Sequence, residues 1–330
     1  MEEKRDLVRS YVAVGLNLEI CLTQTDLPRS TYYYRSTGGV KGKKASTHTV
    51  YQDSVITNGQ VVDKIKWIMN KPFIDYGYKK MTTELKRLGY QIGKSKVYRL
   101  MKENGLLQAS IKPKPRNSRF RTWKTPRPNA PFELLEMDIK YIWVSGMNRY
   151  SYLVTLFDTF NLMALSWGLN YSMKTREVKQ VVLKMIDNHL LPQDIDPKTI
   201  SLHLRTDNGS QFRSQEYLKL LDDLGIQAQY IPNATPQLNG HIEGFYSLVS
   251  KLVCRTYQFQ SIKEARTVFE SFFYVYNHER MISTLADHSP VEFTRLWKQG
   301  RIGMKEVNGK RKYFLKGEDS KKSLLPSRLF

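Results

Sequence analysis

The sequence contains little cysteine and lacks the spacings of a zinc site. Cys21 and Cys254 are the only two cysteines in 330 residues, which excludes a disulfide framework. The six histidines show no His-x-x-x-His spacing and no Cys-x-x-Cys pair occurs, so a structural zinc site is not expected. We therefore expect a reducing, cytoplasmic environment.

Acidic residues are scarce relative to basic ones. Asp and Glu number 31 against 52 Lys and Arg, and the formal charge of +21 predicts a polyanionic partner. The most apolar stretch, residues 150–167, is interrupted by Asp158 and Asn161, so it is too polar to cross a membrane. The N-terminal MEEKRDLVRS lacks the apolar centre of a signal peptide. We therefore expect nucleic acid, and no membrane, as the partner.

Residues 1–36 have the pattern of a compact helical unit. LPRSTYYYR, residues 27–35, predicts a turn followed by a short helix. This succession is typical of a helix-turn-helix unit, whose last helix enters a major groove. The alternative is three small helices that pack together with the tyrosines as their core. The candidate DNA contacts are Arg29, Ser30 and Tyr33.

Two segments follow before the chain becomes strongly basic. Residues 37–58 are rich in Gly, Lys, Ser and Thr and lack periodicity, which predicts a linker. Residues 59–108 predict a second trihelical DNA-binding unit, whose last two helices end at Gly89 and Gly105.

Residues 109–131 form a proline-rich segment that we call the basic strap. From residue 111 onward it carries seven Lys or Arg, five prolines and no acid. A run of charge is usually only solvated, but proline extension, the missing acids and the interleaved Phe120 and Trp123 favour contact with DNA phosphates. The strap cations are Lys112, Lys114, Arg116, Arg119, Arg121, Lys124 and Arg127.

From residue 132 the pattern becomes α/β. Three strand-like segments in a row, between residues 133 and 169, are followed by alternating helices and strands. That order predicts an RNase H-like core over residues 132–260. C-terminal helices of the core (261–298) and a basic tail (299–330) are expected to follow.

Three carboxylates occupy distinctive positions in this core. Asp138 lies inside an apolar strand, where an acid is costly unless it is paired or metal-bound. Asp207 ends a strand and opens the sequence DNGS, which suits a turn as well as a metal ligand. Glu243 follows PQLNG on a predicted helix, and Asn239 and Ser247, which share its face, are candidate DNA contacts.

The spacing of these acids proves little, because roughly one Asp-to-Glu pair at any chosen separation is expected by chance. Their context is more informative, since the predicted fold would bring all three together. Three carboxylates in one place repel one another unless divalent cations neutralise them.

With these residues in view, the chain resembles the DDE transposases of bacterial insertion sequences, which have a retroviral-integrase-like core. TDNGSQF resembles the motif of the second acid, and YNHERMISTLADHSPVEF (276–293) resembles the closing signature. YGYKKMTTELKRLGY resembles the helical module before the core, and LPRSTYYYR resembles the start of the second-frame product in the two-overlapping-frame class.

The resemblance implies an α/β, integrase-like core preceded by small all-α helix-turn-helix-type domains. It implies a transposase that cleaves the ends of a mobile element and joins the 3′-hydroxyl to a new DNA phosphate. Asp138, Asp207 and Glu243 would be catalytic and would hold two Mg²⁺ ions, with Mn²⁺ as a substitute. The implied partners are double-stranded DNA, other copies of the chain and the first-frame protein, and the implied location is the bacterial nucleoid.

The sequence departs from the family pattern at three places. The basic residue expected seven positions after the Glu is Ser250 here, and Lys251 takes its place as a candidate DNA contact. A step of eight turns Lys251 about 80° from Glu243 around a helix. The closing Arg-Pro-His is Arg280-Met281-Ile282, and the Ser-Arg after the second-strand acid is Asn161-Leu162.

Three other functions would explain part of the sequence. A tyrosine recombinase needs an Arg/His cluster around its nucleophile, and the sequence has none. A simple RNase H-like nuclease leaves the upstream helical units unexplained. A DNA-binding regulator with an inactive integrase-like core is the main alternative, and the intact acid triad argues against it.

Overall fold

The computed structural model describes residues 2–34, 45–108, 128–232 and 239–317. The chain divides into two compact units, residues 1–47 and 48–330. Within the described ranges, no helix has the length and apolar character needed to cross a membrane.

In its described residues the first unit contains three helices: α1 (Glu2–Ala13), α2 (Leu18–Thr25) and α3 (Arg29–Tyr33). Asn17 begins α2 because its side chain accepts a hydrogen bond from the backbone N–H of Glu19 at 2.8 Å. The small core that joins the helices contains Val8, Cys21, Leu22 and Leu27.

The second unit begins with a small sheet. Its strands are β1 (His48–Tyr51), β2 (Ser54–Thr57) and β3 (Tyr90–Gln91), in the order β2-β1-β3 and antiparallel. The predicted linker over residues 37–58 is therefore wrong for residues 48–57. β-Branched and aromatic side chains favour strands there. The second partner of β1 is β3, which lies far along the chain.

A trihelical module follows, made of α4 (Asn58–Met69), α5 (Tyr78–Arg87) and α6 (Lys94–Glu103). Thr57 and Gln60 form a capping box that begins α4. The module's core includes Val61, Ile65, Met81, Leu85 and Val97, and Met281 from the C-terminal part of the chain packs into it.

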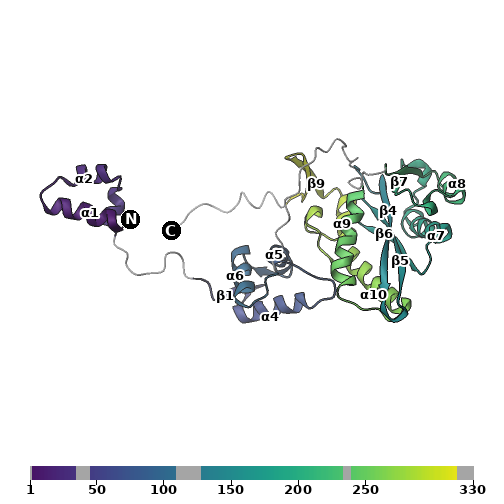
Figure 1. The fold of residues 1–330 in the computed structure, drawn as a ribbon, viewed down its shortest axis with the longest axis horizontal. Coiled ribbons are helices and arrows are strands. Elements are labelled where there is room, and N and C mark those ends of the chain that lie inside the picture. Colours follow the sequence, from purple (N-terminus) through teal and green to yellow (C-terminus); the bar gives the residue numbers. More distant parts are fainter. Residues whose placement is uncertain (1, 35–44, 109–127, 233–238, 318–330) are drawn as a thin grey trace. The chain divides into compact units, whose positions relative to one another are not determined.

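A five-stranded mixed sheet forms the centre of the second unit (Figure 1). Its order is β6-β5-β4-β7-β8, with β4–β5 and β5–β6 antiparallel and β4–β7 and β7–β8 parallel. Three antiparallel strands in chain order followed by two parallel ones are the arrangement of the predicted RNase H-like fold. The strands are β4 (Leu134–Val144), β5 (Arg149–Asp158), β6 (Ala164–Asn170), β7 (His203–Thr206) and β8 (Gln227–Tyr230).

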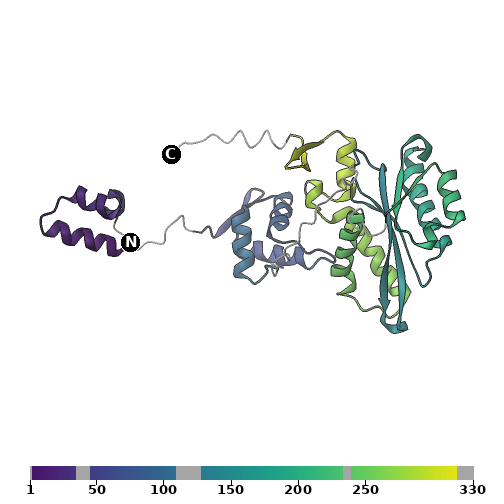
Figure 2. The same cartoon turned by 45° about the horizontal axis from the view of Figure 1, so that its top comes forward.

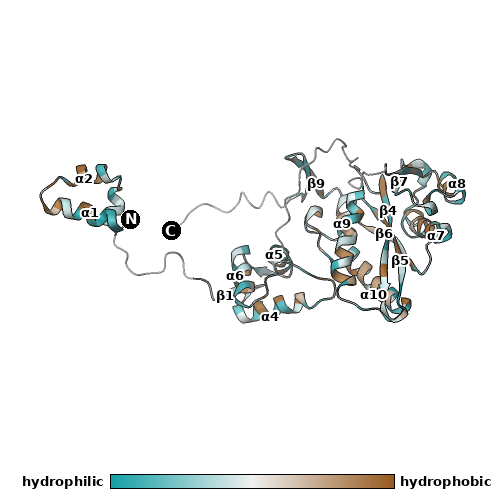
Figure 3. Cartoon of the chain, viewed as in Figure 1, coloured by the Kyte–Doolittle hydropathy of each residue, from teal (hydrophilic) through white to brown (hydrophobic). Residues whose placement is uncertain are grey.

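Helices cover both faces of this sheet (Figures 1 and 2). One face packs against α7 (Thr175–Met185) and α8 (Gln215–Asp223), and the other against α9 (Gly240–Val249) and α10 (Ile262–Tyr274). Because side chains alternate along a strand, Met137 belongs to the core under α7 and Ile142 to the core under α9. Hydrophobic segments gather on the strands and on α10 (Figure 3).

Several helices continue into π-helical turns. In the described residues these are η2 (Ile186–Leu190), η7 (Ser250–Cys254) and η8 (Val275–Glu279), which follow α7, α9 and α10. Helix α11 (Pro290–Lys298) begins at Ser289, whose hydroxyl accepts the backbone N–H of Glu292. Short 3₁₀ turns occur at Ser145–Met147, Leu191–Gln193, Pro197–Thr199, Ser210–Phe212 and Ser283–Leu285.

The C-terminal segment contains a hairpin instead of only a basic tail. Strands β9 (Ile302–Val307) and β10 (Lys310–Leu315) pair antiparallel, so the predicted tail over 299–330 is wrong for residues 302–315. Asn308 and Gly309 connect them with φ values of 52° and 67°. Asn-Gly is the pair that a tight hairpin turn with positive φ favours.

Candidate active site

Asp138 lies near the middle of β4, on the sheet face that α9 covers. Its Oδ1 accepts the backbone N–H of Ile139 at 2.8 Å, and the hydroxyl of Tyr246 donates to its backbone carbonyl at 2.6 Å. Tyr246 belongs to α9, so strand and helix are joined at this residue. Burial raises the pKa of Asp138 to about 6, and the charges of Asp207 and Glu243 add to that rise.

Asp207 directly follows β7, which is the parallel neighbour of β4. It is exposed, and its Oδ1 accepts the backbone N–H of Gly209 at 2.9 Å. This is the Asx turn that the DNGS sequence favours. Asp207 therefore shapes the loop in addition to presenting a carboxylate beside Asp138.

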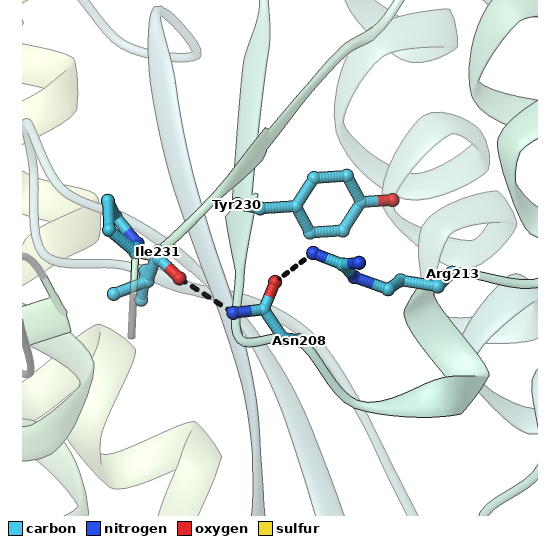
Figure 4. Close-up of a pocket in the computed structure, with 5 residues that line it drawn as sticks. Asn208, Arg213, Tyr230 and Ile231 are labelled. Carbon is cyan, nitrogen blue, oxygen red and sulfur yellow. Dashed lines mark hydrogen bonds between the residues drawn. The ribbon is translucent and has the colours of Figure 1, made fainter. Parts of the chain in front are cut away.

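The loop after Asp207 contacts the end of β8, and residues of both line a small pocket (Figure 4). Asn208 donates from Nδ2 to the carbonyl of Ile231 at 2.8 Å, and it accepts a hydrogen bond from Arg213. The Arg213 guanidinium lies 4.9 Å from the ring centroid of Tyr230. These contacts fix the backbone position next to Asp207.

Glu243 lies in the first turn of α9 and is exposed. The helix is held by its apolar face, which includes Ile242, Phe245 and Val249 in the core under α9. Partial burial raises the pKa of Glu243, and the neighbouring charge of Glu136 raises it further.

Three elements thus bring the predicted acids into one neighbourhood. Asp138 comes from a strand, Asp207 from the end of the next strand, and Glu243 from a helix, and the pKa of Asp138 responds to both of the others. In the part of the chain that is described, no three His, Cys, Asp or Glu side chains already lie close enough to hold an ion. The donor chemistry nevertheless fits a hard divalent cation, because carboxylate oxygens are its preferred ligands and mutual repulsion favours binding a cation.

The other candidates on α9 are placed differently. Asn239, the residue before the helix, is only 5% exposed, so its side chain is not presented to a DNA surface. Ser247 is exposed, and its hydroxyl donates to the backbone carbonyl of Glu243 at 3.0 Å. Lys251 lies in π-helix η7 and forms an ion pair with Asp75 of the segment between α4 and α5.

In the first unit, the candidate DNA contacts lie on the surface of α3. Tyr33 is 59% exposed, whereas Tyr32 packs against the small core. Ser30 is exposed, and Arg29 forms an exposed ion pair with Glu19. The seven strap cations, from Lys112 to Arg127, lie outside the described residues.

Two groups of charged residues were not predicted from the sequence. Glu136 is fully buried beside Asp138 and pairs with buried Arg205 at 3.8 Å. Asp75 receives ion pairs from Lys251 and from Arg280, which is only 5% exposed. The signal for Glu136 was present, because it is a second acid in an apolar strand, but its partners are distant in sequence.

Family models match three parts of the chain. Residues 128–236 and 224–290 each match an integrase core domain. Residues 60–115 match an HTH-like domain, which coincides with the trihelical module. The first integrase match contains Asp138 and Asp207, and the second contains Glu243.

Relatives match most of the chain. InsK of Escherichia coli (strain K12), assigned as a transposase of insertion sequence IS150, is 26% identical over 84% of this chain and 93% of its own length. The transposase of IS904 from Lactococcus lactis is 24% identical over 71% of this chain and 92% of its own length.

Among solved structures, the chain is similar to the integrase catalytic core of HTLV-2 in complex with magnesium. That similarity has 16% identity and a TM-score of 0.39, and it covers 51% of this chain and 99% of that chain. The fold assignment rests on strand order and on the family matches rather than on this likeness. The chain belongs to the transposases of bacterial insertion sequences that carry an integrase core domain and an HTH-like domain.

Proposed function

We propose that this transposase cleaves the ends of its mobile element and joins the 3′-hydroxyl to a new DNA phosphate at a site formed by Asp138, Asp207 and Glu243. The observation that carries the proposal is the arrangement of the acids: Asp138 lies on β4, Asp207 follows the parallel neighbour β7, and Glu243 lies on α9, which the Tyr246 hydroxyl joins to the Asp138 backbone. Such a concentration of negative charge is unexpected in a chain with a net charge of +21 unless cations are held there.

The acids are suited to hold divalent metal. A carboxyl whose pKa is raised to about 6 by burial and like charges binds a proton in the absence of a better cation. When bound, two Mg²⁺ ions, or Mn²⁺ in their place, would activate the attacking oxygen and stabilise the leaving 3′-oxygen. Hard oxygen donors also predict that Ca²⁺ binds, although its looser geometry positions the attacking oxygen poorly.

The protein's own part is to hold the three carboxylates at fixed places. Asp138 is held by the sheet and by the Tyr246 hydroxyl, and Asp207 by the Asx turn with Gly209. Glu243 is held by a helix that buries its apolar face on the sheet. This preorganisation lets one site perform both steps, with water as the attacking group in cleavage and a DNA 3′-hydroxyl in joining.

Tyr246, the tyrosine whose hydroxyl contacts Asp138, is not suited to act as a covalent nucleophile. Tyr246 is buried, and its hydroxyl is engaged with the backbone carbonyls of Asp138 and Leu153. Burial, with the nearby charge of Asp138, raises its pKa well above the ordinary value. This supports direct attack by water or DNA rather than a tyrosine recombinase mechanism.

DNA recognition is divided among several parts of the chain in this proposal. Surface residues of α3, namely Arg29, Ser30 and Tyr33, contact the terminal inverted repeats, and the basic strap contacts phosphates along both the element and the target. Ser247 and Lys251 are candidate contacts near the acids. We propose that several copies assemble on DNA at the bacterial nucleoid, alone or with the first-frame protein.

A strand-transfer assay tests this function against the regulator alternative. Purified full-length chain is incubated with Mg²⁺, a labelled duplex that carries an element end, and a target plasmid. A transposase gives labelled plasmid products. A DNA-binding regulator with an inactive core retards the duplex in a gel but gives no product in Mg²⁺ or Mn²⁺, and that outcome would refute the proposal.

A further inference from the structure

Glu136 is a fully buried acid outside the predicted triad. It lies two residues before Asp138 on β4, so both side chains are on the sheet face that α9 covers. Its Oε2 accepts the backbone N–H of Ile242 at 2.8 Å, and its Oε1 lies 3.3 Å from Nδ1 of His241. A buried acid with these contacts links the sheet to the start of α9.

Glu136 contacts α9 in its first turn, where backbone N–H groups lack acceptors within the helix. The first backbone N–H groups of a helix have no partner within the helix, and Asn239 makes no side-chain capping bond to α9. Glu136 supplies the missing acceptor from the neighbouring strand, with a negative charge at the positive end of the helix dipole. Ile242 directly precedes Glu243, so the bond holds the backbone one residue from the third acid.

Arg205 connects the same carboxylate to the second acid. It is the direct partner of Glu136 in the parallel β4–β7 pairing, and it lies two residues before Asp207. Its guanidinium is 3.8 Å from Glu136 and also donates to Gln229 of β8 at 3.3 Å. Glu136 thus lies at the junction of the three segments that carry Asp138, Asp207 and Glu243.

We propose that Glu136 is a positioning residue for the transposition reaction, which sets the place of Glu243 relative to Asp138 through its bond to the Ile242 backbone. The proposal rests on the function proposed above. The competing explanation is that Glu136 and Arg205 form a buried ion pair that only contributes to fold stability. Such pairs can be replaced by apolar residues without loss of stability, which makes the two roles separable.

The chain offers a matched control for a buried, helix-capping glutamate. Glu177 is 9% exposed, accepts the backbone N–H of Lys174 at 2.9 Å at the start of α7, and pairs with Arg176. It lies in a helix on the opposite face of the sheet from α9. Glu177→Ala therefore removes a similar capping contact without touching the acids.

The decisive comparison uses two double variants of the full chain, Glu136→Gln/Arg205→Met and Glu136→Met/Arg205→Met. Both remove the ion pair, but only the first keeps an oxygen that accepts the Ile242 N–H. Melting temperature, DNA affinity, Mg²⁺-induced rise in melting temperature, and joining rate per folded molecule are measured for both and for Glu177→Ala.

If Glu136 positions Glu243, the Met/Met variant joins DNA about a hundredfold more slowly than the Gln/Met variant, as expected for a misplacement of the order of 1 Å. Its Mg²⁺-induced rise in melting temperature also shrinks, while DNA affinity matches that of the Gln/Met variant and metal-free melting temperature falls only by the loss of one helix-capping bond. Equal joining rates and equal Mg²⁺ responses in the two doubles would refute the positioning role.

Failure of the proposed function gives a different result, because wild-type protein then shows no joining. In that case the Mg²⁺ response of the two doubles still tests the positioning of Glu243. Glu177→Ala is expected to retain wild-type joining per folded molecule. A loss in Glu177→Ala as large as in the Met/Met variant would mean that any lost helix cap lowers activity, and would also refute the specific role of Glu136.

Discussion

The two faces of the five-stranded sheet are built from the same strands but differ in what they bury. The face under α7 and α8 buries apolar side chains such as Leu135, Met137 and Leu156. Both faces also bury acids, but Asp158 and Glu177 on the α7 side accept backbone N–H groups, whereas Glu136 on the α9 side pairs with buried Arg205 close to the candidate acids. Buried charge costs free energy that apolar burial does not. The buried ion pair lies on the face that carries the candidate acids.

The largest expected effect comes from neutralising the acids on the α9 face. Asp138→Asn, Asp207→Asn and Glu243→Gln should each lose detectable cleavage and joining, because each removes one charged metal ligand. DNA binding should persist, since the net positive charge increases. Strand-transfer and gel-shift assays on the same preparations check both expectations.

The same variants should not lose fold stability. Asp138→Asn removes a carboxylate whose ionisation is opposed by burial, so its metal-free melting temperature should equal or exceed that of the wild type. An Asp138→Asn protein that joins DNA at the wild-type rate would remove Asp138 from the site.

The next effect is a loss of stability on the other face. Leu156→Ala truncates a fully buried side chain under α7 and should lower the free energy of unfolding by about 2–5 kcal/mol. Joining per folded molecule should remain near the wild-type rate. Urea denaturation and strand transfer provide the two measurements.

Leu153→Ala is the matched variant on the same strand, because Leu153 is equally buried but lies under α9. It should cost similar stability and also slow joining, since it loosens the packing of the helix that carries Glu243. Equal joining rates in the two variants would contradict the division between the faces.

A smaller effect should appear in the pH dependence of the metal-free protein. The pKa of Asp138 is raised from 3.8 to about 6 in the folded protein. The folded state therefore holds a proton that the unfolded chain releases in this range. The Asp138 contribution to stability should be present at low pH and decline as pH rises through about 6.

Urea unfolding in EDTA between pH 4.5 and 7.5, compared between wild type and Asp138→Asn, isolates this contribution from that of other acids. The stability difference between the two proteins should change in favour of the variant as pH rises. A difference that stays constant with pH would mean that Asp138 titrates in the ordinary acidic range.

The smallest effects are expected where charge lies on the surface rather than in the sheet. Replacing Arg29 and Tyr33 should lower the preference for element ends over random DNA by about 1–3 kcal/mol, as expected for base-edge contacts.

Neutralising the seven strap cations should weaken binding to all DNA alike, and the salt slope should fall by about 0.9 for each lost phosphate contact. Titrations at several salt concentrations separate the two; an unchanged salt slope would exclude the strap from the interface.

The core, and the placement of the three acids on a strand, a strand end and a helix, could be predicted because their signals are local. Asp138 interrupts an apolar strand, Asp207 ends one, and the DNGS turn forms with Gly209 as its sequence indicates. The strands β4 to β8 follow from short apolar runs whose ends are marked by turn residues.

Features that depend on pairing at a distance could not be predicted in the same way. Strand β1 pairs with both β2 and β3, and only folding brings β3 beside it. The β9–β10 hairpin did carry a local signal in Asn308-Gly309, but the high charge of the segment favoured a tail. Glu136 meets Arg205 and Ile242 only through the sheet register, which the sequence does not specify.

The most direct test of the central claim, that these acids hold metal, is a change of ligand at Asp207. Asp207→Cys replaces a hard oxygen with a softer thiolate, which Mn²⁺ accepts better than Mg²⁺. Asp207→Asn is the control, because Asn also favours the turn but lacks the charge. The joining rate of each variant is divided by that of the wild type in the same metal. For the cysteine variant, this ratio should be at least about tenfold higher in Mn²⁺ than in Mg²⁺. For the asparagine variant, the ratio should not rise in Mn²⁺. Equal relative activity of Asp207→Cys in the two metals would show that this side chain does not contact the ion.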